Sequence, residues 1–258
     1  MDVETIRARL SALPISEIQY LPETYSTNDD AMAWAQAGAP EGVVVIADKQ
    51  LKGRGRLGRM WVTQPGTSLA FSMIFRPTLE EIEKLSLFSP LGALAVAVAL
   101  EDLGLSPEIK WPNDVLLSRK KVCGVLAETV WMGSHINGVV LGIGINVATG
   151  SVPDSNMLLF PATCVESELG KPVDRLSLLE SVLRHLIEWR KQIRTERFIE
   201  EWKKRLAFLG EKVTVQKPDG EITGRFQDVD EHGALVLSVE EQYHTIFAGD
   251  VKLRPLEE

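Results

Sequence analysis

Three arginines and three glycines make up most of the segment Gly53–Arg59, which reads Gly-Arg-Gly-Arg-Leu-Gly-Arg. Glycine allows positive φ and close approach of the backbone to a ligand, while guanidinium groups bind phosphate or carboxylate through paired hydrogen bonds. No Gly-Lys-Ser/Thr sequence and no helix follow, so this is neither a Walker loop nor a dinucleotide-binding fingerprint. The residue types favour anion binding; a solvated loop or a nucleic-acid-binding Gly-Arg segment is the alternative.

A second candidate is the segment Lys110-Trp111-Pro112-Asn113-Asp114, which joins two short apolar runs. Proline fixes φ and removes a backbone donor, which holds the lysine and the Asn-Asp pair in a set relation across a sharp turn. An ammonium group and a carboxylate held in this way could bind a nucleotide phosphate and its Mg²⁺. Taken alone, the motif fits equally well a turn in which Asn113 and Asp114 cap backbone amides.

Two further segments place unusual residues on apolar strands. Lys121 follows a charged hairpin tip and opens the apolar run 122–126, so it can point into a pocket or into solvent. Leu141–Asn146 alternates glycine with apolar residues, which indicates close approach of a ligand or of a packed strand. Cys123 has no evident catalytic partner and is interpreted as a small buried residue. The four histidines lack metal-ligand spacing.

These segments need a scaffold of strands and helices to position them. Apolar periodicity predicts helices over 2–12, 28–38, 79–103 (interrupted near Pro90) and 175–209. It predicts strands over 17–21, 43–47, 68–75, 109–111, 115–117, 122–130 and 138–147, with 52–59 as a loop. After Gly210 the period changes to two, with strands over 212–216, 222–229, 234–238 and 243–248. Short strands of this kind are typical of a small barrel that follows an α+β body.

The composition is that of a globular protein, with 258 residues, 45% hydrophobic and 25% charged. The net charge of −8 argues against a protein that coats DNA or anionic lipid, yet 49–59 holds five basic residues and no acid. By contrast, 211–258 carries 5 basic and 11 acidic residues. Two cysteines, no signal peptide and no apolar run long enough to span a bilayer predict a cytoplasmic protein without membrane attachment.

In this order the segments resemble the bacterial biotin–protein ligase family, also called biotin–[acetyl-CoA-carboxylase] ligase. Any one motif would be a weak match, but five in the right order are highly specific. The resemblance runs from about Leu21 to the C-terminus. The matching elements are five motifs, Ser26-Thr27-Asn28, Gly53–Arg59, Lys110–Asp114, Lys121-x-x-Gly124 and Gly142–Asn146, together with the single residues Gln50 and Trp61.

The resemblance implies a fold and a reaction. Residues 1–210 would form a class II synthetase-like catalytic domain, a mixed β-sheet with helices packed on one face, and 211–258 a small SH3-like β-barrel. Biotin and ATP would give biotinoyl-5′-AMP and pyrophosphate, and biotin would then pass to one lysine of a biotin carboxyl carrier protein, such as that of acetyl-CoA carboxylase. Carboxylate attack on a polyanion needs positive charge where the anions meet, and loop 52–59 would supply it and exclude water.

The resemblance also implies roles for single residues. Arg54, Lys110 and Lys121 would be catalytic, Asp114 would bind Mg²⁺, and Phe160 in the segment 151–163 would contact adenine. The biotin-binding residues would be Ser26, Thr27, Asn28, Gln50, Arg54, Gly55, Arg56, Trp61, Lys121, Gly124, Gly142 and Gly144, with the backbone of the last three leaving room for the bicyclic ring. The nucleotide-binding residues would be Arg54, Arg56, Arg59, Lys110, Asn113 and Asn146.

Some members of this family carry an N-terminal winged helix-turn-helix that represses biotin-synthesis genes. About twenty residues precede the first matching strand here, too few for a three-helix DNA reader, so we expect a ligase without DNA binding. A homodimer formed through the edge of the central sheet is a further expectation. The alternatives are a lipoate–protein ligase or octanoyl transferase, which share the general fold but lack the Gly-Arg-Gly-Arg loop, and a nucleic-acid-binding module.

Overall fold

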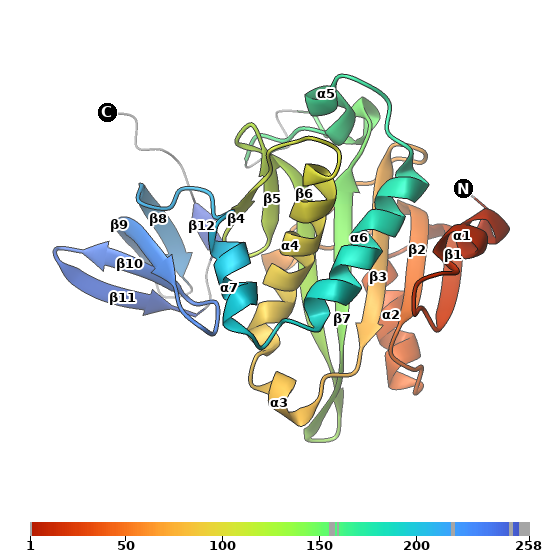
Figure 1. The fold of residues 1–258 in the computed structure, drawn as a ribbon, viewed down its shortest axis with the longest axis horizontal. Coiled ribbons are helices and arrows are strands. Elements are labelled where there is room, and N and C mark those ends of the chain that lie inside the picture. Colours follow the sequence, from red (N-terminus) through yellow and green to blue (C-terminus); the bar gives the residue numbers. More distant parts are fainter. Residues whose placement is uncertain (1, 155–157, 159, 218–219, 248–249, 253–258) are drawn as a thin grey trace.

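The computed structural model describes residues 2–154, 158, 160–217, 220–247 and 250–252, and contains two β-sheets (Figure 1). The larger sheet has seven strands in the order β1-β2-β3-β7-β6-β5-β4. Only β1 and β2 pair in parallel, so the sheet is mixed, as predicted. Its strands are β1 (Glu17–Thr24), β2 (Val43–Gln50), β3 (Ser68–Phe75), β4 (Glu108–Lys110), β5 (Asp114–Leu117), β6 (Lys120–Met132) and β7 (His135–Asn146).

Helices cover both faces of this sheet unequally. Alternate residues of a strand point to opposite faces. Val44 and Ile46 of β2 join the main core beneath α4 and α6, which form the predicted layer on one face, whereas Val43 and Val45 pack with α2 on the other. None of the helices in the described part of the chain is long and apolar enough to cross a membrane. The helices are α1 (Val3–Leu10), α2 (Thr27–Gln36), α3 (Leu79–Ile82), α4 (Phe88–Glu101), α5 (Val165–Leu169), α6 (Arg175–Arg190) and α7 (Glu196–Lys203).

Two predicted helices are divided in the structure. The 79–103 segment is interrupted before Pro90. A proline in the middle of a helix would remove a hydrogen bond, so a new helix, α4, begins at Phe88 and places Pro90 in its first turn, where no helical hydrogen bond is lost. The 175–209 segment breaks between α6 and α7 and ends at Lys203 rather than at Leu209. Residues 205–207 instead extend along β4, with Ile109 N–H donating to the Arg205 carbonyl (2.6 Å), because the outer edge of β4 offers unpaired backbone groups.

The second sheet comprises β8 (Lys212–Lys217), β9 (Gly220–Val229), β10 (Leu235–Val239), β11 (Gln242–Ile246) and β12 (Asp250–Lys252). Its order is β11-β10-β9-β8-β12, and β12 is a strand that the sequence pattern did not predict. This small antiparallel sheet is consistent with the SH3-like prediction, although among the described residues β11 and β12 do not pair to close a barrel. Ala248, the end of the predicted strand 243–248, lies outside the described residues.

Trp111 joins the two sheets at the centre of the predicted nucleotide motif. Its side chain is buried, and its indole N–H donates to the carbonyl of Gly233 in the turn between β9 and β10 (2.8 Å). Gly233 has φ of 78°, and a Cβ there would approach the Leu87 side chain to 2.9 Å, so both conformation and space favour glycine. The C-terminal sheet therefore braces the turn that carries Lys110 and Asp114.

We predict that Trp111→Phe lowers the free energy of unfolding by about 1–3 kcal/mol, because the buried Gly233 carbonyl loses its donor. Chemical denaturation measures this change. The matched control is Trp131→Phe, which alters a tryptophan with 57% exposure and is expected to stay within about 0.5 kcal/mol of the parent. Equal stabilities of the two variants would contradict the bracing role of Trp111.

Candidate active site

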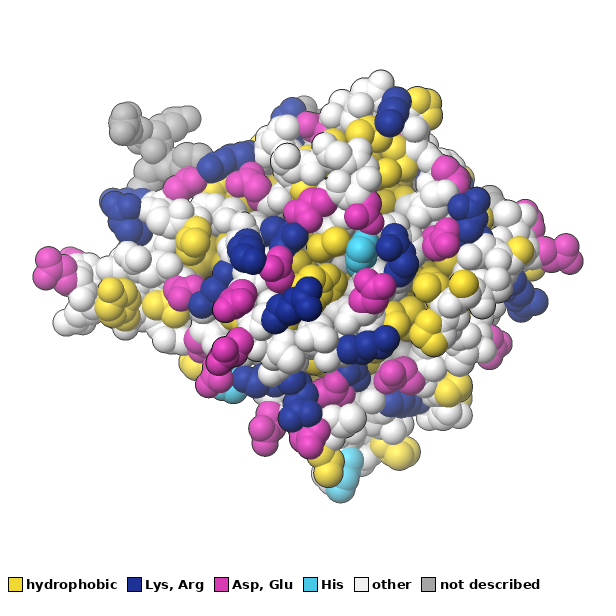
Figure 2. Space-filling model, viewed as in Figure 1, with side chains coloured by type: hydrophobic (Ala, Val, Ile, Leu, Met, Phe, Trp, Pro, Cys, Tyr) yellow, Lys and Arg dark blue, Asp and Glu magenta, His cyan; other side chains and the backbone are white. Residues whose placement is uncertain are grey.

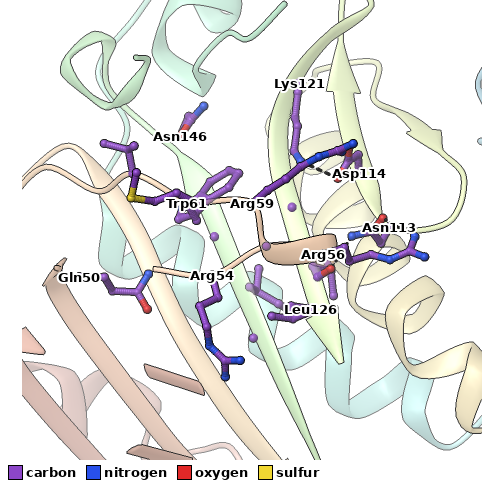
Figure 3. A pocket seen from close by; sticks show the side chains of 18 of the residues that line it. Gln50, Arg54, Arg56, Arg59, Trp61, Asn113, Asp114, Lys121, Leu126 and Asn146 are labelled. Carbon is purple, nitrogen blue, oxygen red and sulfur yellow. Dashed lines mark hydrogen bonds and ion pairs between the residues drawn. The ribbon is translucent and has the colours of Figure 1, made fainter. Parts of the chain in front are cut away.

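A cavity of about 390 Å³ opens on the face of the large sheet that carries α2 (Figure 3). The loop between β2 and β3 crosses it, and the starts of α2 and β6 form its walls. Every residue of the predicted site lines this one cavity, although the separate roles stay predictions: Ser26, Thr27, Asn28, Gln50, Arg54, Gly55, Arg56, Arg59, Trp61, Lys110, Asn113, Asp114, Lys121, Gly124, Gly142, Gly144, Asn146 and Phe160.

One end of the cavity presents polar amide and hydroxyl groups. The backbone N–H of Thr27 at the start of α2 donates to Gln50 Oε1 (2.8 Å), and the Thr27 hydroxyl lies 3.1 Å from the same oxygen. The Ser72 hydroxyl lies 2.8 Å from Thr27 Oγ1 and 2.6 Å from Asn28 Oδ1. These contacts orient several neutral donors and acceptors toward one wall, which suits an uncharged polar group in a largely apolar pocket.

The glycines of β7 give space to side chains that enter the cavity. A Cβ on Gly142 would stand 2.0 Å from Asn28 Oδ1, and one on Gly144 would stand 2.4 Å from the Trp61 indole. That these glycines also leave room for a bicyclic ligand stays a prediction. Their missing side chains admit Asn28 and Trp61, which then face the cavity themselves.

A buried carboxylate lies between two ammonium groups at the other end. Asp114 Oδ1 is 2.7 Å from Lys121 Nζ and Asp114 Oδ2 is 3.5 Å from Lys110 Nζ. Burial by itself raises the pKa of Asp114, but the charges of Lys121 and Lys110 outweigh burial and hold that pKa below its usual value. Burial lowers the pKa of Lys110, and the charge of Asp114 opposes this shift. Asp114 therefore favours the protonated form of Lys110 in this basic cluster inside the protein.

The arginines of the loop point in different directions. Arg56 lies beside Asn113, with its guanidinium 3.4 Å from Asn113 Oδ1, close to the basic cluster. Arg54 points away from that cluster in Figure 3, and its guanidinium pairs with Glu128 and Asp29. Arg54 lines the cavity as predicted, yet its charged end is directed toward two carboxylates rather than toward the place where Lys110 and Lys121 meet.

A further part of the cavity lining comes from the segment after β7. The Asn146 side-chain amide donates to the Thr163 carbonyl (3.1 Å), and Thr163 N–H donates to the Lys121 carbonyl (2.9 Å). Lys110 Nζ lies 5.0 Å from the Phe160 ring centroid, within the range of a cation–π contact. Positions 155–157 and 159 of the predicted adenine-covering segment lie outside the described residues.

Sequence reasoning missed Asp29, Ser72 and Glu128. Glu128 is the carboxylate in the otherwise apolar predicted strand 122–130, and that contrast was the available signal. Its partner could not be read from the pattern, because Arg54 reaches it only once the loop has folded back across β6. Ser72 likewise sits on a fully buried strand, where a hydroxyl needs a partner such as Thr27 or Asn28.

Comparisons with known proteins identify the family of the chain. Residues 20–146 match the model of the biotin/lipoate A/B protein ligase family, and residues 208–254 match the biotin protein ligase C terminal domain. The biotin–[acetyl-CoA-carboxylase] ligase of Paracoccus denitrificans is 35% identical over 227 residues, which cover 84% of this chain and 92% of that protein. The bifunctional ligase/repressor BirA of Bacillus spizizenii is 32% identical over 232 residues, covering 88% of this chain and 71% of that protein.

The chain belongs to the biotin protein ligase family. A solved structure of the Aquifex aeolicus biotin protein ligase in complex with biotin and ATP has a TM-score of 0.80 and 33% identity, covering 93% of this chain and 100% of that chain. The protein is therefore an ATP-dependent biotin ligase, and the relatives support this activity over a lipoate-type one.

Cys123 of this ligase does not fit a thiolate mechanism. Cys123 is fully buried on β6, and burial raises the pKa of its thiol far above its ordinary value. A thiol of this kind stays protonated at neutral pH. The interpretation of Cys123 as a small buried residue is thus confirmed, and acyl transfer through an enzyme thioester has no nucleophile at this position.

The donor set around Asp114 is a poor fit to a resident Mg²⁺ ion. Both carboxylate oxygens already face ammonium groups, and within the described ranges no group of three or more His, Cys, Asp or Glu side chains could hold a metal. Magnesium is usually bound by one or two carboxylates together with substrate phosphates. A metal that accompanies ATP would thus depend on the phosphates for its ligands.

We predict that Asp114→Asn moves the alkaline limb of the pH–rate profile of the ligase to lower pH. The Asp114 carboxylate raises the pKa of Lys110 against the effect of burial, so its loss lets Lys110 release its proton at lower pH. The measurement is kcat/KM for ATP against pH. The control Glu23→Gln removes a carboxylate that pairs with Lys49 at the surface, and it should leave the alkaline limb of the profile in place. An alkaline limb that does not move in Asp114→Asn would contradict the effect of Asp114 on the pKa of Lys110.

Proposed function

We propose that the cavity joins biotin to ATP and then delivers biotin to a lysine on the carrier domain of acetyl-CoA carboxylase or of a similar biotin-dependent enzyme. The observation that carries this proposal is the division of the cavity into a neutral polar end at Thr27 and Gln50 and a basic end at Lys110 and Lys121. A neutral ureido ring suits the first end, and a carboxylate facing a triphosphate suits the second.

The basic end would act by bringing two anions together. The biotin carboxylate would attack the α-phosphorus, with loss of pyrophosphate, and the amine of the acceptor lysine would then attack the acyl carbon, with loss of AMP. We assign Lys121 to the carboxylate, because its Nζ also lies 5.5 Å from the Trp61 ring that would cover the biotin tail. Lys110, Arg56 and Arg59 are assigned to the phosphates, with Asn113 orienting Arg56. Mg²⁺ bound by ATP would supply further neutralisation of its phosphates.

The remaining binding residues follow from the same division. Ser26, Thr27, Asn28 and Gln50 are proposed for the ureido end, Gly124 for close approach of the ligand to β6, and Asn146 and Phe160 for the nucleoside.

We also propose a catalytic unit over 1–210 and a C-terminal unit over 211–258. Two separate family models, two separate sheets and the positive φ of Gly210 (81°) support a boundary there.

We further propose a cytoplasmic homodimer. Two buried cysteines without a disulfide suit a reducing compartment that also supplies ATP. β1 forms one edge of the large sheet and leaves a row of backbone groups for pairing with a second copy. Light scattering of the purified protein, with and without biotin and ATP, tests this assembly, and a monomer under both conditions would overturn it.

Biotin-dependent exchange of radiolabelled pyrophosphate into ATP tests the proposed reaction. We expect exchange only when biotin is present, followed by incorporation of biotin into a purified carrier domain. Octanoyl transfer without ATP would instead favour the related transferase. Cys123→Ala should retain ligase activity to within about two-fold, because a buried protonated thiol takes no part in the chemistry.

Lys121→Ala is expected to weaken biotin binding by about 10- to 150-fold, because a hydrogen bond to a charged group contributes about 1.5–3 kcal/mol. Isothermal titration calorimetry measures the change. Lys120→Ala is the matched control, since Lys120 is the neighbouring exposed lysine of the same hairpin. Wild-type affinity in Lys121→Ala would refute the assignment of Lys121 to the biotin carboxylate.

A further inference from the structure

Arg54 forms a two-pronged ion pair with a carboxylate from a distant strand. Its two terminal nitrogens donate to the two oxygens of Glu128 on β6, at 2.9 and 2.8 Å. One of them also lies 2.7 Å from Asp29 Oδ1 in the first turn of α2. The loop between β2 and β3 is thereby tied to two other elements, β6 and α2. Paired Arg–carboxylate bonds fix direction as well as distance.

Glu128 connects this ion pair to the polar end of the cavity. Its Oε2 atom also accepts from the Asn28 side-chain amide (2.7 Å), and Asn28 in turn lies against Ser72 and Gly142. A continuous hydrogen-bonded path therefore runs from the loop through one carboxylate to the wall proposed for the ureido ring. Asn28 and the loop therefore share one carboxylate, that of Glu128.

The charges around Arg54 make it a poor receptor for an anion. Two carboxylates lie within 3 Å of its guanidinium, so an incoming carboxylate or phosphate would meet a net negative neighbourhood. The opposite holds at Asp114, where one carboxylate pairs with both Lys110 and Lys121 and is also influenced by the charge of Arg56. Arg54 therefore lies beside an excess of negative charge, whereas Arg56 lies beside an excess of positive charge.

We propose that Glu128 is a positioning residue that holds the Gly-Arg loop over the cavity through Arg54, and that Arg54 anchors the loop rather than contacting either anion. Held at Arg54, the loop carries Arg56 to Asn113 and the basic cluster. The loop forms a hook that is closed by two backbone hydrogen bonds. Gly55 N–H donates to the Arg59 carbonyl and Trp61 N–H donates to the Gly53 carbonyl, both at 2.8 Å. Because Arg54 and Arg56 lie within this hook, anchoring Arg54 also restricts the position of Arg56.

A double-mutant cycle on Arg54 and Glu128 tests the anchor in the ligand-free protein. Hydrogen exchange of the Gly55 and Trp61 amides, measured by NMR, reports opening of the hook without any reaction. We expect Arg54→Ala and Glu128→Ala each to speed this exchange about ten-fold, and the double variant to add nothing further. Glu211→Ala, which removes an equally two-pronged pair with Arg119 far from the loop, should leave exchange unchanged.

The second readout is the dissociation rate of biotinoyl-5′-AMP, and this arm depends on the proposed function. Arg54→Ala and Glu128→Ala should each release the adenylate faster than the wild type. Their thermal unfolding midpoints should equal that of the Glu211→Ala control. Absence of adenylate in the wild type would overturn the proposed function and leave the exchange result intact. Additive effects on exchange, or a Glu128→Ala variant that behaves as wild type while Arg54→Ala releases adenylate faster, would overturn the anchor and return Arg54 to direct contact with the ligand.

Discussion

The site depends on a buried carboxylate, that of Asp114, which pairs with two lysines, Lys110 and Lys121. Lys110 and Asp114 are both buried, and an isolated ammonium group there would release its proton or the structure would open. Asp114 compensates for this burial because it lies between Lys110 and Lys121, and each of its two oxygens faces one of the ammonium groups. The geometry requires β4, β5 and the start of β6 to lie side by side, which their antiparallel pairing secures.

The rest of the fold holds that arrangement from two sides. On one side, α4 and α6 cover the sheet and leave its other face for the cavity (Figure 1). On the other side, Trp111 and the residues after α7 brace the outer edge of β4. Figure 2 shows the α4 and α6 side of the molecule, where dark blue and magenta side chains are interspersed, so concentration of positive charge is not a property of this surface as a whole. The basic cluster is local to the cavity.

Most strands, and a set of residues that line one cavity, could be predicted from the sequence, because both depend on local patterns. The glycines of β7 and Lys121 near the start of β6 can be recognised from their immediate neighbours in the sequence. The direction of Arg54 could not be predicted, since its partners Glu128 and Asp29 come from other elements. The end of α7 was missed for the same reason: the backbone beyond it pairs with β4, and tertiary pairing outweighed helical periodicity.

The pairing of residues 205–207 with β4 has a consequence for how the protein acquires its site. Ile109 and Arg205 are separated by 96 residues, and Trp111 finds its acceptor still later in the chain. Contacts of such long range form late, after local hairpins and helices have closed. During synthesis the cavity walls therefore emerge first, while the brace behind the Lys110–Asp114 turn waits for the last fifth of the polypeptide. A nascent chain of this ligase holds all of its site residues before it holds the contacts that keep them in place.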